Sequence, residues 1–174
     1  MYADESLNWQ VGSMAEQAFF TNALTPSDAA VQNLWNDSYK IIYQCNRIID
    51  GVAQSNAVTA ASKDQLTGEA LFTRSFVHFY LVQLFGDVPY VTSTDYRVNK
   101  TVAKMPVGAM YTQLAKDLLQ AGTLLENTAA PVNTRPSKYA AEALLARLYL
   151  YAEQYDKALE YSNSVIAAGF SVDQ

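Results

Sequence analysis

The residues best suited to chemistry are two glutamates, Glu69 and Glu142, and one histidine, His78. Two carboxylates about 5 to 10 Å apart across a cleft could cleave a glycosidic bond. These glutamates, however, occupy the same place in two copies of one repeated sequence, and nothing in the pattern brings them into one cleft. The chain has one His and one Cys, so the further ligands of a metal site and the partners of a catalytic triad are missing. We therefore predict no catalytic residue, metal site or cofactor, and an α-helical glycosidase is the weakest hypothesis.

The remaining reactive or charged residues favour structural roles. Cys45 lies on the apolar side of a helical pattern and is expected in the core, and His78 is expected to be a hydrogen-bonded core or edge residue. Asp87 and Asp95 lack the oxygen-rich spacing of a calcium loop. The net charge of -5 and the pI near 4.7 argue against nucleic-acid binding. No apolar run approaches the roughly 20 residues of a membrane span.

Aromatic residues point to a different chemistry, because sugar rings stack on flat aromatic faces while their hydroxyls need polar groups nearby. The chain has 12 Tyr and 2 Trp. Most of the larger aromatics fall on helical stripes and are expected in the core: Trp35, Tyr39, Phe76, Tyr80, Tyr111, Tyr149 and Tyr155. The candidate ligand-binding residues are those off a stripe with polar neighbours: Trp9, Tyr96, Arg97 and Asn99.

A repeated helix indicates the scaffold that would position them. Residues 69–76 read Glu-Ala-Leu-Phe-Thr-Arg-Ser-Phe, and residues 142–149 read Glu-Ala-Leu-Leu-Ala-Arg-Leu-Tyr. This repetition predicts an all-α fold of tetratricopeptide-like helical hairpins, which bury their apolar faces by stacking on copies. The repeated Glu and Arg are five residues apart, about 140° around a helix, so each is expected to contact a neighbouring helix.

Periodicity and turn residues predict about five main helices with a long inserted loop. Capping patterns are expected at Thr25 with Asp28 and at Ser62 with Gln65, and Gly86 should end the second helix. The second half of that helix is apolar on nearly every side and is expected to be buried from several directions. The helices are expected at about 25–52, 62–85, 106–126, 136–152 and 155–168, with residues 86–105 as the inserted loop.

The chain, residues 1–174, is predicted to be a single helical repeat domain with repeat units at about 62–126 and 136–169. The first two dozen residues are apolar without a clean period, and we expect them to pack on something. The start lacks a signal peptide, and the end follows a helix directly, so a piece of a longer protein is expected. An uncapped apolar face at such an end predicts possible self-association.

Several segments together resemble the SusD/RagB family of outer-membrane nutrient-binding lipoproteins, over about residues 25–172. The phrase Phe-Gly-Asp-Val-Pro at 85–89, followed at a distance by an Ala-rich helix, is the most specific. The matching positions are Trp35, Tyr39, Ile42, Asn46, Ile49, Gly68–Ala70, Arg74, Phe76, Leu84–Pro89, Tyr111, Leu114, Asp117, Leu118, Arg135–Tyr151, Tyr155–Ala158, Val165, Ile166 and Gly169.

The resemblance implies a surface protein of the bacterial outer membrane, held by a lipid anchor that this chain does not contain. Such proteins bind oligosaccharides, or sometimes peptides, and act with a SusC-type TonB-dependent transporter. The chain departs from the family in lacking an N-terminal lipid-accepting cysteine and in having about a third of the usual length. The alternative hypothesis is a tetratricopeptide scaffold that holds a peptide in a concave groove. The long insertion at 86–105 favours the first hypothesis, since ordinary repeats have short turns there.

Overall fold

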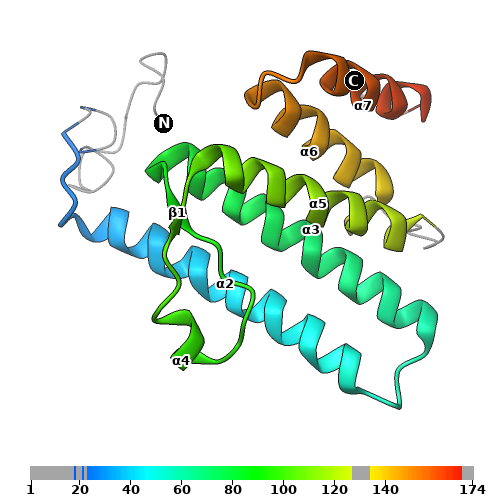
Figure 1. Ribbon diagram of the computed structural model, residues 1–174, viewed down its shortest axis with the longest axis horizontal. Coiled ribbons are helices and arrows are strands. Elements are labelled where there is room, and N and C mark those ends of the chain that lie inside the picture. Colours follow the sequence, from blue (N-terminus) through cyan, green and yellow to red (C-terminus); the bar gives the residue numbers. More distant parts are fainter. Residues whose placement is uncertain (1–17, 19–20, 22, 127–133, 170–174) are drawn as a thin grey trace. The chain divides into compact units, whose positions relative to one another are not determined.

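The computed structural model of the chain describes residues 18, 21, 23–126 and 134–169. The chain divides after Lys40 into two compact units. The helices are α2 (Ala29–Gln54), α3 (Ala60–Phe85), α4 (Tyr96–Asn99), α5 (Val107–Leu125), α6 (Lys138–Tyr151) and α7 (Tyr155–Ala167), and the strands are β1 (Val88–Pro89) and β2 (Lys104–Met105) (Figure 1). Five long helices, the four-residue α4 and one short pair of strands make up these elements, so the all-α prediction is confirmed.

The unit that ends at Lys40 contains the start of α2. The backbone nitrogen of Thr25 donates to Asp28 Oδ2 at 2.5 Å, within the turn that precedes the helix. The helix itself begins at Ala29, so Thr25 does not cap it, and the predicted start at residue 25 is a few residues too early. Trp35 and Tyr39 lie one turn apart with ring centroids 4.9 Å from each other, and both are half-buried.

In the unit that begins at Ile41, successive helices pack as neighbours. α3 packs on α5, α5 on α6 and α6 on α7, and the four run in alternating directions (Figure 1). Phe79 joins three of these helices, because its ring lies 6.4 Å from that of Tyr111 on α5 and 5.5 Å from that of Tyr151 on α6. The surrounding core is aliphatic: Leu81, Met110, Leu114, Leu118, Leu145 and Leu148. This is the predicted arrangement of stacked helical hairpins.

The start of α3 differs from the prediction, whereas its end agrees. Thr59, with extended backbone, is the N-cap, and its hydroxyl accepts from the backbone nitrogen of Ser62 at 3.3 Å. Ser62 is therefore a first-turn residue, and the prediction of a cap at Ser62 with Gln65 is wrong. Thr59 precedes two alanines, which extend the helix N-terminally because they favour it. Gly86 ends the helix with a φ of 70°, a conformation that favours glycine.

The repeated charged residues contact neighbouring elements, as predicted. Glu69 Oε2 accepts from Arg135 Nη2 at 2.7 Å, just before α6. Glu142 Oε2 accepts from the Ser164 hydroxyl of α7 at 2.6 Å. Arg147 Nη1 donates to the hydroxyl of Tyr80 on α3 at 2.7 Å.

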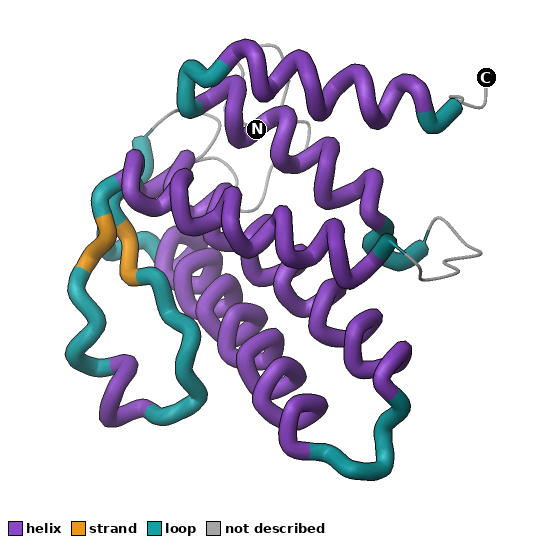
Figure 2. The backbone as a smooth tube through the Cα atoms, turned by 45° about the vertical axis from the view of Figure 1, so that its right-hand side comes forward, coloured by secondary structure: helices purple, strands orange, loops and turns teal. Residues whose placement is uncertain are grey.

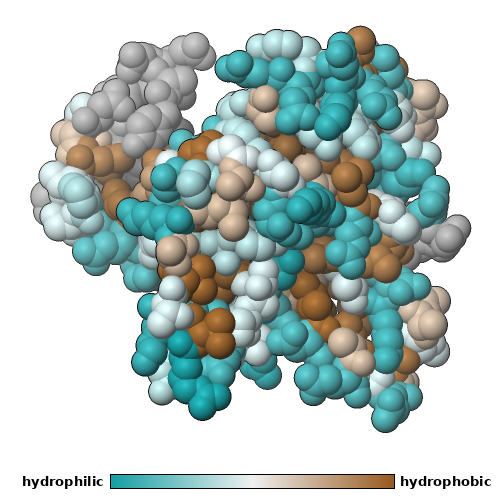
Figure 3. Space-filling model, in the orientation of Figure 1, coloured by the Kyte–Doolittle hydropathy of each residue, from teal (hydrophilic) through white to brown (hydrophobic). Residues whose placement is uncertain are grey.

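Three aromatic residues expected in the core are exposed. Phe76, Tyr80 and Tyr155 are 43%, 37% and 63% exposed. The rings of Phe76 and Tyr80 contact each other along α3 in a tilted arrangement with centroids 4.8 Å apart, on a partly exposed side of the helix. The expectation that this half of α3 is buried from several directions therefore holds for its buried residues, which contact α5, α6 and β1, and fails for the face that carries Phe76 and Tyr80. Tyr149 is buried, as expected. On the face drawn in Figure 3, the apolar residues at the surface form separate brown patches among hydrophilic ones.

Candidate functional site

The inserted segment, residues 86–105, leaves the helices and returns to them at one point. β1 and β2 pair antiparallel, with Val88 opposite Met105 and Pro89 opposite Lys104. Figure 2 shows this pair in orange at the base of the segment, with α4 at its far end. Asp87 Oδ1 also accepts from the backbone nitrogen of Val107 at 3.0 Å, at the start of α5. The predicted long loop thus projects from the helices, and the strand pair closes it at its base.

The far end of the segment is organised by Asp95. Its side chain caps α4 by accepting from the Arg97 backbone nitrogen at 2.8 Å. The same carboxylate accepts from Arg97 Nη2 at 2.7 Å and from Nε at 3.1 Å. The hydrogen bonds from Arg97 hold the pKa of Asp95 below its usual value. Both charges therefore stand as a fixed, solvent-facing pair at the tip.

Tyr96 gives this tip an open aromatic surface. Its side chain is 74% exposed, and Val98 beside it is 50% exposed. An aromatic ring next to an ion pair offers both of the groups that a sugar requires, a flat apolar face and hydrogen-bonding partners. Tyr96 and Arg97, which are neighbours in the sequence, both lie on α4 at this exposed tip.

The other two predicted residues stand apart from this pair. Asn99 is half-buried, and its Nδ2 donates to the Ser93 carbonyl at 2.8 Å. Part of its hydrogen-bonding capacity is therefore used within the segment. Trp9 lies outside the described residues.

A buried polar cluster lies where the segment meets the helices. Arg74 of α3 is 6% exposed. Its Nη2 donates to Asp117 Oδ2 of α5 at 2.8 Å, and its Nη1 donates to Asn46 Oδ1 of α2 at 2.8 Å. Asn46 Nδ2 then donates to the carbonyl of Val91 in the segment at 3.1 Å. Two buried side chains thus link three helices to the backbone of the segment.

Tyr90 adds a second link from the segment to this cluster. Its hydroxyl donates to Asp117 Oδ2 and accepts from Arg74 Nη2 at 3.3 Å. Gln113 Nε2 completes the set by donating to Asp117 Oδ1 at 3.1 Å. Burial raises the pKa of Tyr90, so the phenol stays protonated and able to donate. We call these five side chains the Arg74 cluster: Asn46, Arg74, Tyr90, Gln113 and Asp117.

His78 and Cys45 are buried beside the helices and not available to a ligand. His78 Nδ1 donates to the Arg74 carbonyl at 2.9 Å, and its ring lies 5.0 Å from that of Tyr90. Burial lowers the pKa of His78 to about 4, so the ring is neutral. Burial likewise raises the pKa of the Cys45 thiol, which makes it a poor nucleophile. Both predicted core assignments are confirmed.

Sequence reasoning missed the Arg74 cluster as a unit. A signal was available, because Asn46 and Asp117 fall on the apolar stripes of their helices, where a polar residue needs a buried partner. The pattern does not identify that partner, because Arg74 lies 28 residues from Asn46 and 43 residues from Asp117 along the chain.

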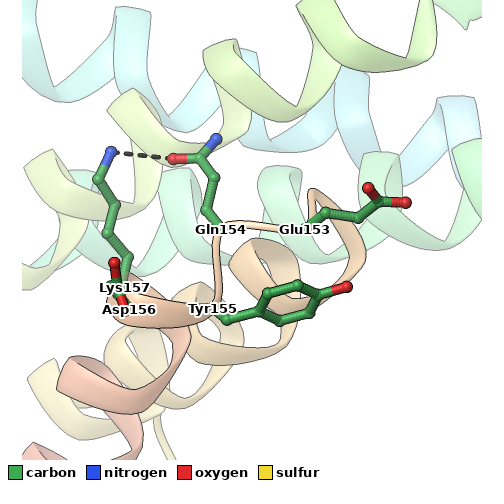
Figure 4. Close-up of a pocket in the computed structure, with 5 residues that line it drawn as sticks. All are labelled: Glu153, Gln154, Tyr155, Asp156 and Lys157. Carbon is green, nitrogen blue, oxygen red and sulfur yellow. Dashed lines mark hydrogen bonds between the residues drawn. The ribbon is translucent and has the colours of Figure 1, made fainter.

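A hollow in the surface lies at the turn between α6 and α7. Figure 4 shows its lining, with the ring of Tyr155 directed away from Lys157. Lys157 Nζ donates to Gln154 Oε1 at 3.0 Å, and Glu153 has a φ of 58°. The hollow has one exposed ring and several polar groups, so it is the alternative place for a small polar ligand.

Two features of the described residues bear on other functions. In these residues, no group of three or more His, Cys, Asp or Glu side chains is arranged to hold a metal ion. Of the helices placed here, none is long and apolar enough to cross a membrane.

Comparison with known proteins identifies the family. The family described as "Starch-binding associating with outer membrane", a SusD-like family, matches residues 2–150. SusD-like protein P2 of Formosa agariphila is 32% identical over 142 residues, which cover 78% of this chain and 27% of that protein. The chain therefore belongs to the SusD-like family of carbohydrate-binding proteins.

Solved structures agree with this assignment. A SusD-like carbohydrate-binding protein of Bacteroides fragilis superposes with a TM-score of 0.75 at 25% identity, covering 84% of this chain and 29% of that one. A laminarin-binding SusD-like protein gives a TM-score of 0.77 at 25% identity, covering 86% and 32%. The chain thus spans about a third or less of the length of these relatives.

Proposed function

We propose that this chain is the helical part of a glycan-binding protein that takes up oligosaccharides at the bacterial outer membrane. The family match over residues 2–150 carries this proposal. The role is binding without catalysis, since the family is described by what it binds. The family match does not favour the alternative of a general tetratricopeptide scaffold.

The proposal includes a partner and a location. A SusC-type TonB-dependent transporter would receive the ligand, and the protein would sit on the cell surface through a lipid anchor. The ligand class is an oligosaccharide, with a peptide as the second class. The family description, which includes association with the outer membrane, supports this part.

Tyr96 and Arg97 are the residues we propose to contact the ligand or the transporter. Tyr96 is the most exposed tyrosine among the described residues, and the ion pair of Asp95 and Arg97 fixes polar groups beside its ring. Asn99 would support this tip through Ser93. Trp9 remains a sequence-based candidate.

The test is isothermal titration of the purified chain with laminarin, starch and a wider panel of oligosaccharides. We expect saturable binding that is lost in Tyr96→Ala and kept in Tyr155→Ala, a matched removal of an exposed tyrosine at the α6–α7 turn. The reverse pattern would move the site to that turn. No binding across the panel, from a chain shown to be helical by circular dichroism, would refute a glycan site in this part of the protein.

A further inference from the structure

The inserted segment is attached to the helices at three levels. Its base is closed by β1 and β2. Its next residues, Tyr90 and Val91, enter the Arg74 cluster. Further along, the Thr94 hydroxyl donates to Asp50 Oδ2 of α2 at 3.0 Å. A connection of this length otherwise retains much conformational freedom, so each attachment removes a large set of alternative positions.

The middle attachment differs from the other two because it contains a buried charge. Arg74 needs Asp117 and Asn46 as partners in the interior, since an unpaired buried charge is strongly destabilising. The phenol of Tyr90 supplies one of the donors to Asp117, and Val91 supplies the acceptor for Asn46. Two of the partners in this cluster therefore come from the segment. Detaching the segment would expose the ion pair to water and remove those two partners together.

The tip beyond this attachment is closed by its own hydrogen bonds. Asp95 caps α4, Asn99 Nδ2 reaches back to the Ser93 carbonyl, and the Lys100 nitrogen donates to the Tyr96 carbonyl at 2.9 Å. These bonds are all local, and a single helical turn is not stable by itself, so the tip keeps them only while the segment stays attached. Where it lies depends on the attachments that precede it.

We infer that the Arg74 cluster holds the inserted segment in place, so that Asn46 and Tyr90 act as positioning residues for the exposed tip at Tyr96. The positioning itself requires no ligand. The consequence for ligand affinity rests on the proposed function, because preorganising a binding loop raises affinity by reducing the entropy lost on binding.

The test is amide hydrogen exchange of the ligand-free chain, followed by mass spectrometry. The variants are Tyr90→Phe, which removes only the hydroxyl in the cluster, and Asn46→Ala, which removes the bonds to Val91 and to Arg74. We expect exchange of the amides at 98–102 to rise roughly tenfold in each, the effect of losing about one net hydrogen bond. Exchange in α6 and α7 should stay unchanged.

Two matched controls separate positioning from general stability. Tyr111→Phe removes a hydroxyl that accepts from Gln83 on an exposed surface, and Gln44→Ala removes an exposed amide from α2. Both should leave the segment unchanged. Unchanged exchange at 98–102 in Tyr90→Phe and Asn46→Ala would overturn the inference. An equal rise across all helices would also overturn it, because the cluster would then be only a general stabiliser.

Ligand binding then gives a separate reading. If a glycan binds at Tyr96, Tyr90→Phe should weaken it severalfold while Tyr111→Phe leaves it unchanged. Equal affinity in both would overturn the link between the cluster and the site. If no glycan binds, the proposed function fails, while the exchange result still decides the positioning role.

Discussion

The two helical hairpins, α3 with α5 and α6 with α7, use the same arginine of the repeated sequence differently. Arg74 of the first is 6% exposed and pairs with Asp117. Arg147 of the second is exposed and donates to the Tyr80 hydroxyl. The first hairpin carries the inserted segment over its arginine, whereas only a short turn joins α6 to α7. The comparison teaches that the same residue of the repeat has a different role where the neighbouring connection is long enough to cover it.

The largest expected difference lies in the two arginines themselves. Arg74→Ala leaves the Asp117 carboxylate buried without its cation, which should lower the free energy of unfolding by about 3 to 5 kcal/mol. Arg147→Ala removes an exposed contact and should cost less than about 1 kcal/mol. Urea unfolding followed by circular dichroism measures both. Equal losses would mean that the two arginines are equivalent despite their surroundings.

The second difference concerns pH. His78 is buried with its pKa lowered to about 4, while Tyr151, at the matching place of the second hairpin, is 53% exposed. The unfolded chain binds a proton on His78 below about pH 6.5, and the folded chain does so only near pH 4. His78 should therefore lower the free energy of unfolding by about 3 kcal/mol as pH falls from 7 to 4.

A variant isolates this contribution from the carboxylates that also titrate. His78→Asn keeps a donor for the Arg74 carbonyl and removes the titratable ring. Its unfolding free energy should fall less steeply between pH 7 and pH 4 than that of the unchanged chain. Parallel curves would show that the charge on His78 does not matter, although Arg74, Asp117 and Tyr90 surround it.

The smallest expected effect concerns a small residue at matching positions of the two hairpins, Gly68 in the first and Ala141 in the second. A Cβ added at Gly68 would lie 2.7 Å from Leu125 Cγ, a buried residue of α5. The matching residue of the second hairpin is Ala141, which is fully buried. Gly68→Ala should destabilise by about 1 to 3 kcal/mol through overpacking, despite the better helix propensity of alanine. Ala141→Gly should cost about 1 kcal/mol. Thermal unfolding of both variants checks this, and a stabilised Gly68→Ala would show that the crossing is loose.

Much of the fold was predictable because its elements are local. The extents of α2 and α5, the stop at Gly86 and the repeated helix each depend on neighbouring residues, and they agree with the structure to within a few residues. The start of α3 was misplaced by a few residues, because Thr59 and Ser62 are both good caps and local sequence does not choose between them. Exposed Phe76 and Tyr80 were misassigned, since a helix that is apolar all round does not indicate which side is left open.

The candidate site was less predictable because its parts come from distant positions. Sequence reasoning selected Tyr96 and Arg97 by their polar company, and Tyr96 is exposed on α4, while their role in ligand binding stays a prediction. It did not foresee the β1–β2 pair or the bonds from Tyr90 and Asn46. Those contacts depend on which distant side chains the packing of α2, α3 and α5 brings together.

The pairing of β1 with β2 has a consequence for how such proteins diversify. A connection that leaves the helices and returns to them at one point can be lengthened, shortened or exchanged at its far end while the packing of the helices stays the same. Because lengthening a loop adds little to the entropic cost of closing it, new surface can be grafted at the tip beyond Thr94, where the strand pair and the bonds from Tyr90, Val91 and Thr94 stay in place. The β1–β2 pair and the attached residues that follow β1 thus form a constant base, and the tip of the inserted segment is the part that can be exchanged.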